Sequence, residues 1–121
     1  KLISNHNEWK PYDVEDRLIV FTSDIVREFD FPIKIYASKY YAEQLIRSFG
    51  SAALNYGEFA GAGTSKDKIN KLRICLKELK ECKNNLRIQL KANLLKNDET
   101  NLVYESLQLS KIVATIIKNQ K

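Results

Sequence analysis

Five polar side chains at helical spacing are the clearest candidates for chemistry in this sequence. They lie in the stretch 44–61 (QLIRSFGSAALNYGEFAG) and, at about 100° per residue, share one narrow face of a helix: Gln44, Arg47, Ser51, Asn55 and Glu58. Arg47 and Ser51 are four residues apart, as are Ser51 and Asn55, so neighbouring side chains can meet. Three interpretations stay open: a structural or subunit-interface network, a ligand-binding stripe, and a catalytic site. The stripe lacks a histidine, a thiolate and paired carboxylates, which argues against catalysis and for a protein that is not an enzyme.

The two cysteines and the single histidine do not form a second candidate site. Cys75 and Cys82 are seven residues apart, about 10 Å along one side of a helix, which exceeds the roughly 7 Å between Cα atoms that a disulfide allows. Buried, reduced thiols of a cytoplasmic protein are therefore expected. His6 stands without a cluster of cysteines or carboxylates, so neither a metal nor another cofactor is expected. Gly61–Ser65 is not a phosphate loop, because Lys66 follows Thr64 and Ser65 instead of preceding them.

A row of basic side chains is the second candidate site. Residues 66–96 carry ten Lys or Arg against three acidic residues, a balance of +7 in a chain whose net charge is +5. On a helix, six of them fall within an arc of about 80°, here called the basic ridge: Lys66, Arg73, Lys77, Lys80, Arg87 and Lys91. Such a ridge could follow the phosphates of a nucleic acid. The alternative is a solvated, lysine-rich face. No aromatic residue interrupts the ridge, so stacking on unpaired bases is not predicted.

Four amphipathic segments must position these residues. The 121-residue chain has only four glycines and two prolines, and its apolar periodicity predicts helices over about 13–30, 38–60, 65–95 and 99–119. Residues 1–12 show no periodicity and are expected to form an irregular arm before a single domain. Each helix can bury its apolar stripe only against the others, and short links make neighbours antiparallel. The sequence therefore predicts an all-α, antiparallel up-down-up-down four-helix bundle over 13–121, with no membrane partner because no run of eighteen apolar residues occurs.

The expected boundaries rest on caps and breakers. The dipeptide Phe31-Pro32 is expected to end the first helix, with 33–37 as a connector and Ser38 as the cap of the second helix. Thr64 with Asp67 predicts a capping box at the start of the third helix.

The apolar residues predict what each helix buries. The first helix is expected to turn one stripe to the core: Val14, Leu18, Phe21, Ile25 and Phe29. The third helix carries an additional apolar row away from its core seam, formed by Ile74, Ile88 and Leu95. Because three apolar residues in one row suggest a second buried surface, this row predicts either a homo-oligomer interface or a wider core.

The order Gln44, Arg47, Ser51, Asn55, Glu58 on the second helix resembles the signature of the four-helix-bundle proteins encoded in 23S rRNA intervening sequences. The preceding Phe31-Pro32, the Gly/Ser turn at 61–65 and the leucine-rich third helix extend the resemblance over about residues 14–119. The resemblance implies a small bacterial cytoplasmic bundle that assembles with itself, often as a ring-like homopentamer. A related protein, the accessory variability determinant of diversity-generating retroelements, binds nucleic acid and a reverse transcriptase. The partners implied are therefore further copies of the chain, RNA or DNA, and a protein such as a reverse transcriptase.

Residues and resemblance together favour a non-enzymatic, oligomeric bundle that binds RNA or DNA through the basic ridge. The alternative is an adaptor or scaffold for other proteins without direct nucleic-acid contact.

Overall fold

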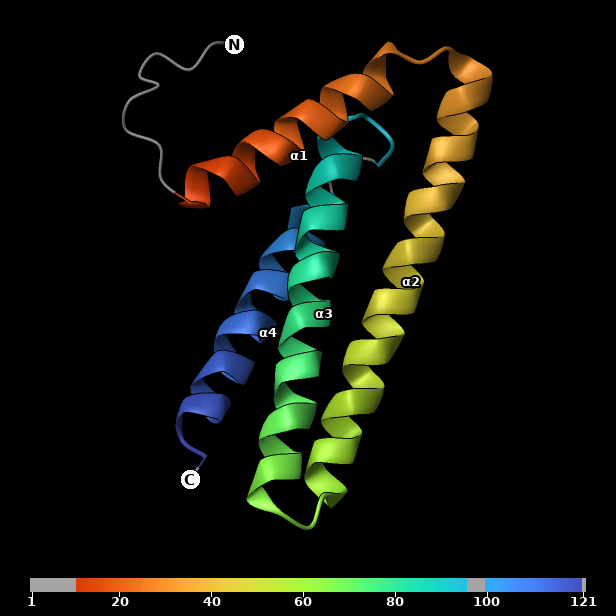
Figure 1. The fold of residues 1–121 in the computed structure, drawn as a ribbon. Helices are drawn as coiled ribbons and strands as arrows, with labels where there is room; N and C mark the ends of the chain where they lie inside the picture. The colour runs from red at the N-terminus through yellow and green to blue at the C-terminus, as the bar shows by residue number, and fades with distance from the viewer. Residues whose placement is uncertain (1–10, 96–99, 121) are drawn as a thin grey trace.

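The computed structural model describes residues 11–95 and 100–120, and the secondary structure of this part of the chain is α-helical. The elements are α1 (Pro11–Glu28), α2 (Phe31–Gly61), α3 (Ser65–Lys91) and α4 (Thr100–Lys118). The predicted all-α four-helix fold is confirmed. Helices α2, α3 and α4 lie side by side in alternating directions, whereas α1 runs obliquely across the C-terminal part of α3 (Figure 1). The expected arm falls almost entirely on residues outside the described ranges.

Helix α2 begins at Phe31, so the expected connector over 33–37 and the Ser38 cap were wrong. The cap is Asp30, whose carboxylate accepts a hydrogen bond from the backbone N–H of Ile33 at 3.2 Å. Pro32 lies in the first turn of α2, where its missing N–H would have no helical partner in any case. Proline disfavours helix in the residue before it, but its fixed φ also suits the start of a helix. Only Phe29 and Asp30 therefore separate α1 from α2.

Helix α3 starts as predicted and ends earlier than predicted. Thr64 Oγ1 accepts from the backbone N–H of Asp67 at 3.1 Å, which is one half of the expected capping box. At the other end, Asn93 has a φ of 64°. The N–H of Leu94 bonds to the carbonyl of Gln89 at 2.8 Å and that of Asn93 to Leu90 at 3.2 Å. This is a Schellman motif with asparagine in the left-handed position, so Leu95 lies beyond the helix.

The core lies along α3, the helix between α2 and α4. One cluster joins these three helices through Ala52, Leu72, Cys75, Leu79 and Val113. A second, smaller cluster joins α1 and the start of α2 to the segment after α3 through Val26, Ala37 and Ala92. On α3 itself, Leu72, Leu79 and Leu86 are buried.

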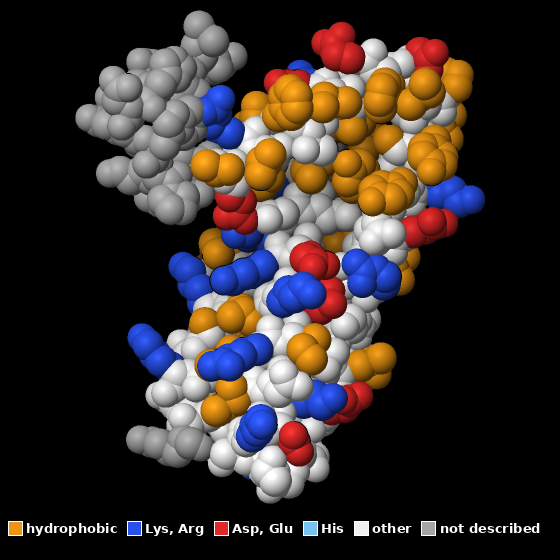
Figure 2. Space-filling view, in the orientation of Figure 1, with side chains coloured by type: hydrophobic (Ala, Val, Ile, Leu, Met, Phe, Trp, Pro, Cys, Tyr) orange, Lys and Arg blue, Asp and Glu red, His pale blue; other side chains and the backbone are white. Residues whose placement is uncertain are grey.

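The apolar stripe of α1 is exposed, so the expectation that it faces the core was wrong. Its five residues are 40–64% exposed, whereas Ile19, Ser23 and Val26 on another side of α1 are buried. Ser23 Oγ donates to the carbonyl of Ile19 at 2.7 Å and lies 3.5 Å from the carbonyl of Ile88 on α3. Because serine is small, α1 can approach α3 closely along the side that carries Ser23. The wider apolar face of α1 is then left exposed to solvent. Figure 2 shows hydrophobic side chains gathered over α1 and the start of α2.

Candidate nucleic-acid interface

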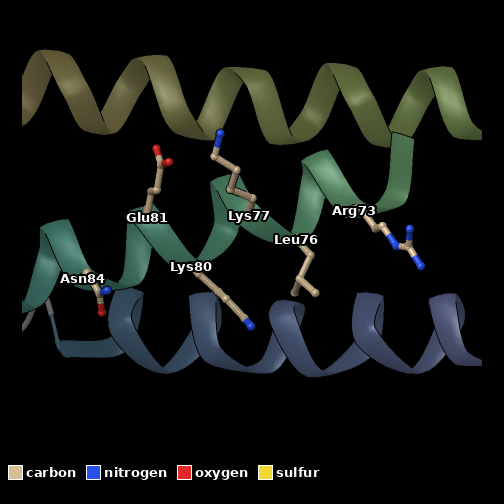
Figure 3. Close-up of a pocket in the computed structure, with 6 residues that line it drawn as sticks. All are labelled: Arg73, Leu76, Lys77, Lys80, Glu81 and Asn84. Atoms are coloured by element: carbon tan, nitrogen blue, oxygen red, sulfur yellow. The ribbon is translucent and has the colours of Figure 1, made fainter. Parts of the chain in front are cut away.

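A shallow hollow of about 370 Å³ lies along one side of α3, and we call it the basic groove. Figure 3 shows Lys77 and Glu81 pointing toward α2, and Leu76 and Lys80 pointing toward α4. The residues that line the basic groove all belong to α3. They are Arg73, Leu76, Lys77, Lys80, Glu81 and Asn84.

The basic ridge is only partly available to a ligand. Lys66, Arg73, Lys77, Lys80 and Lys91 belong to none of the ion pairs found among the described residues, and each is at least partly accessible to solvent. Arg87 is different, because its Nη2 donates to Asp16 Oδ1 of α1 at 3.1 Å. Sequence periodicity placed all six on one face, but it could not show that another helix covers part of that face.

Helix α1 divides the ridge into two parts. Next to the Arg87–Asp16 pair, Asn84 Nδ2 donates to Glu15 Oε2 at 2.7 Å. Two carboxylates of α1 therefore lie over the C-terminal half of α3. The uncovered part, from Lys66 to Lys80, spans fifteen residues, and its first and last residues are about 21 Å apart at 1.5 Å per residue. This part contains the basic groove.

The polar stripe of α2 does not form one network. Arg47 Nη2 lies 3.6 Å from Glu81 Oε1 on α3, whereas Glu58 Oε1 lies 2.6 Å from Lys71 Nζ, also on α3. Arg47 and Glu58 are eleven residues apart in α2, about 16 Å along the helix, so they do not pair with each other.

The remaining stripe residues make contacts within α2. Gln44 Oε1 accepts from Arg47 Nε at 3.2 Å, and Asn55 Nδ2 donates to the carbonyl of Ser51 at 2.9 Å. Sequence reasoning missed the buried Ser48, whose Oγ donates to Glu81 Oε1 at 3.2 Å. It also missed Glu81 and Lys71, because the α2 sequence does not show which residues of another helix will face it.

The predicted oligomer row is not continuous in the structure. Ile74, Ile88 and Leu95 are not fully exposed, and Leu95 lies past the Asn93 turn instead of on α3. The more extensive exposed apolar surface lies elsewhere, between residues 14 and 40. Its members include the α1 stripe together with Val20, Phe31, Ile33, Ile35, Tyr36 and Tyr40.

Both cysteines are buried and unbridged. Burial raises the pKa of Cys75 above its ordinary value. Burial, reinforced by the negative charges of Glu78 and Glu81, raises the pKa of Cys82 to about 11. Because the thiolate is the nucleophile and the metal ligand, neither thiol is activated for chemistry at neutral pH. Among the described residues, no group of three or more histidines, cysteines or carboxylates is arranged to hold a metal ion.

The chain matches the model of a known protein family. Residues 12–115 match the protein-family model described as 23S rRNA-intervening sequence protein. The matched range takes in almost all of α1, the whole of α2 and α3, and most of α4. No curated protein and no solved structure matches the chain. Within the described residues, every helix is too short or too polar to cross a membrane.

Proposed function

Because this chain belongs to the 23S rRNA-intervening sequence protein family, we propose that it is a non-enzymatic, self-associating helical-bundle protein that binds RNA or DNA through the basic groove. One observation carries the proposal of nucleic-acid binding. Arg73, Lys77 and Lys80 line the same groove and are engaged in no ion pair with a described residue. Three unneutralised cations in a groove attract a phosphate backbone.

The groove favours contacts with phosphates over contacts with bases. Its lining contains no aromatic side chain, so bases have nothing to stack on there. Its one carboxylate, Glu81, is occupied by Arg47 and Ser48, which reduces repulsion of a phosphate. We therefore expect binding that depends strongly on salt and weakly on sequence.

The described side chains support a binding role over a catalytic one. Both thiols are buried and protonated at neutral pH. The carboxylate of Glu58 is held by Lys71, and the carboxylate of Glu81 by Arg47. We place this binding role in the cytoplasm, following the resemblance to the bacterial bundles.

Self-association is supported by the exposed apolar surface between residues 14 and 40. Contiguous apolar patches of more than a few hundred Å² on a monomer usually mark an interaction site. Sedimentation velocity over a range of protein concentrations tests this part of the proposal, and a monomer at all concentrations would overturn it.

Nucleic-acid binding is tested by a salt titration with fluorescently labelled duplex and single-stranded RNA and DNA. The affinity should fall linearly on a logarithmic plot against salt. Lys77→Gln and Lys80→Gln should each weaken binding and reduce the slope by about 0.7–0.9 for each phosphate that the lysine no longer neutralises. Lys39→Gln is the matched control, because Lys39 is an exposed lysine of α2 outside the groove. An affinity that does not change with salt concentration would contradict the proposal. So would groove variants whose affinity and salt slope equal those of Lys39→Gln.

The exposed apolar surface also favours a second candidate function, an adaptor that docks another protein. A partner captured from lysate should then survive nuclease treatment and be lost on Phe31→Glu. A partner lost on nuclease treatment would instead favour the nucleic-acid function.

A further inference from the structure

An apolar groove opens on the side of α3 away from the basic groove. At 100° per residue, Cys75 and Leu79 lie about 150° around α3 from the basic groove. Ala52, Cys75, Leu79 and Val113 are buried in the floor, whereas Phe49, Tyr56 and Ile112 at the rim are 40–54% exposed. The groove measures about 300 Å³ and is lined by side chains of α2, α3 and α4: Phe49, Ala52, Ala53, Tyr56, Cys75, Leu79, Leu109, Ile112 and Val113.

We propose that this apolar groove receives α1 of a second copy of the chain, with Phe21 as the inserted side chain. The occupant is inferred from the α1 stripe, whose five apolar side chains remain 40–64% exposed when the described part of the chain is folded. Phe21 lies at the centre of that stripe and is its most exposed member, at 64%. A helix with one large apolar face is stable when that face is covered. The inference rests on the self-association proposed above and specifies the contact that produces it.

The chain's own α1 cannot reach the middle of the groove. Only Phe29 and Asp30 link α1 to the start of α2 at Phe31, and the 18 residues of α1 span about 27 Å. Folded back along α2, α1 would end near Phe49, which is eighteen residues from Phe31. Tyr56 is seven residues further, about 10 Å beyond that point. In addition, Asp16 and Glu15 hold α1 against Arg87 and Asn84 on the other side of α3. A second copy has neither restriction.

The area available is adequate for a stable contact. Taking roughly 200 Å² for a fully accessible large side chain, the five half-exposed residues of the α1 stripe offer about 500 Å². The adjoining exposed residues up to Tyr40 bring the total to about 1,000 Å², compared with about 800 Å² per partner in a standard interface.

Small residues beside the groove allow a helix to come near. Gly50, Ala53 and Gly57 are exposed on α2, and a Cβ at either glycine would meet nothing within 4 Å. Nothing in the described part of the chain uses this close approach, so it is open to a second copy.

Disulfide trapping between two differently substituted chains tests the contact. A Phe21→Cys chain is mixed with an Ile112→Cys chain under mild oxidation, and the covalent product is identified by non-reducing electrophoresis and mass spectrometry. We expect a 21–112 disulfide between copies. Native Cys75 lies in the floor of the groove, so both chains also carry Cys75→Ala, which removes a competing 21–75 disulfide. Native Cys82 is buried and does not line the groove. Leu54→Cys replaces Ile112→Cys as the matched control, because Leu54 is 70% exposed and does not line the groove.

The possible outcomes separate this contact from the proposed function. A 21–112 bond within one chain carrying both substitutions, with no bond between chains, would show that the chain's own α1 fills the groove and would overturn the inference. An oligomer in sedimentation without the mixed disulfide would overturn the contact and leave self-association standing. A monomer would overturn both, and the salt titration of nucleic-acid binding would still be interpretable. Ala53→Glu should also dissociate the oligomer, whereas Leu54→Glu should not.

Discussion

Arg87 Nη2 lies 3.1 Å from Asp16 Oδ1, and this ion pair joins α1 to the basic ridge. The side chain of Asp16 is 60% exposed and that of Arg87 is 25% exposed. Solvent therefore screens the pair, and its contribution to stability should not exceed about 1 kcal/mol. Its effect on binding should be larger, because it neutralises one of the six cations of the ridge and places a carboxylate beside the path of a phosphate backbone.

Asp16→Asn should therefore tighten nucleic-acid binding while changing the free energy of unfolding by less than about 1 kcal/mol. Removing the carboxylate frees Arg87 for a phosphate, so the salt slope should steepen by about 0.7–0.9. Asp24→Asn is the matched control, since it makes the same change of charge at an exposed α1 position that belongs to none of the ion pairs among the described residues. Equal gains in affinity for the two variants would mean that net charge alone, and not the contact with Arg87, sets the affinity.

Double-mutant cycles should find coupling between Arg47 and Glu81 and none between Arg47 and Glu58. The first two are 3.6 Å apart across the α2–α3 contact, whereas the second two are about 16 Å apart along α2. Urea denaturation of Arg47→Ala, Glu81→Ala, Glu58→Ala and the double variants gives the coupling energies. We expect about 0.2–1 kcal/mol for the first pair, as is usual for solvent-accessible ion pairs, and agreement with additivity for the second. Coupling between Arg47 and Glu58 would restore the single network that the spacing suggested.

Leu72→Ala should be severely destabilising. Leu72 is 0% exposed in the cluster that joins α2, α3 and α4, so the substitution leaves a cavity and should lower the free energy of unfolding by about 2–5 kcal/mol. Leu54→Ala makes the same change at a 70% exposed position and should cost less than about 0.5 kcal/mol. Urea midpoints for the two variants provide the comparison, and similar values would show that the packing around Leu72 is not as described.

The pKa of Cys82 predicts a loss of stability in alkali. Its ordinary value is 9.0, and burial followed by the charges of Glu78 and Glu81 raises it to about 11 in the folded chain. Below pH 9 the thiol is protonated in both folded and unfolded chains, so its contribution is fully present. Between pH 9 and 11 the unfolded chain loses this proton first, and the free energy of unfolding should fall.

Chemical denaturation measured between pH 8 and 11 tests this loss, with Cys82→Ala as the comparison. In the variant, the free energy of unfolding should decline less steeply with pH. The decline that remains should include the contributions of Cys75 and Tyr41, whose pKa values are also raised by burial. A decline as steep as that of the wild type would contradict the assignment.

The sequence predicts most of the fold because periodicity and caps act locally. Thr64 lies three residues before Asp67, and both the cap and the start of α3 follow from that spacing. Pro32 was misjudged because proline can end one helix or begin the next, and Asp30 favours the second use. Asn93 was missed because asparagine enters the left-handed region only where the chain that follows can complete the turn.

The candidate site was less predictable, because it depends on which helix covers which face. The spacing of Arg73, Lys77 and Lys80 places them on one side of α3, and they line one groove. Arg87 has the same spacing, but it forms an ion pair with Asp16 because α1 crosses α3 beside Arg87. The direction in which α1 faces depends on Ser23, a small polar residue that packs where a larger apolar residue would hold the helices further apart.

The opposite placement of the two grooves on α3 has a consequence for how tightly long ligands are held. A copy whose apolar groove is filled still presents Arg73, Lys77 and Lys80 on the other side of the helix. An assembly would therefore carry several short cationic segments at fixed separations. Once one segment holds a strand, the others meet the same strand at high effective concentration. Affinity should consequently rise steeply once the nucleic acid is long enough to reach a second copy, while fragments shorter than that should bind as weakly as they bind a single chain.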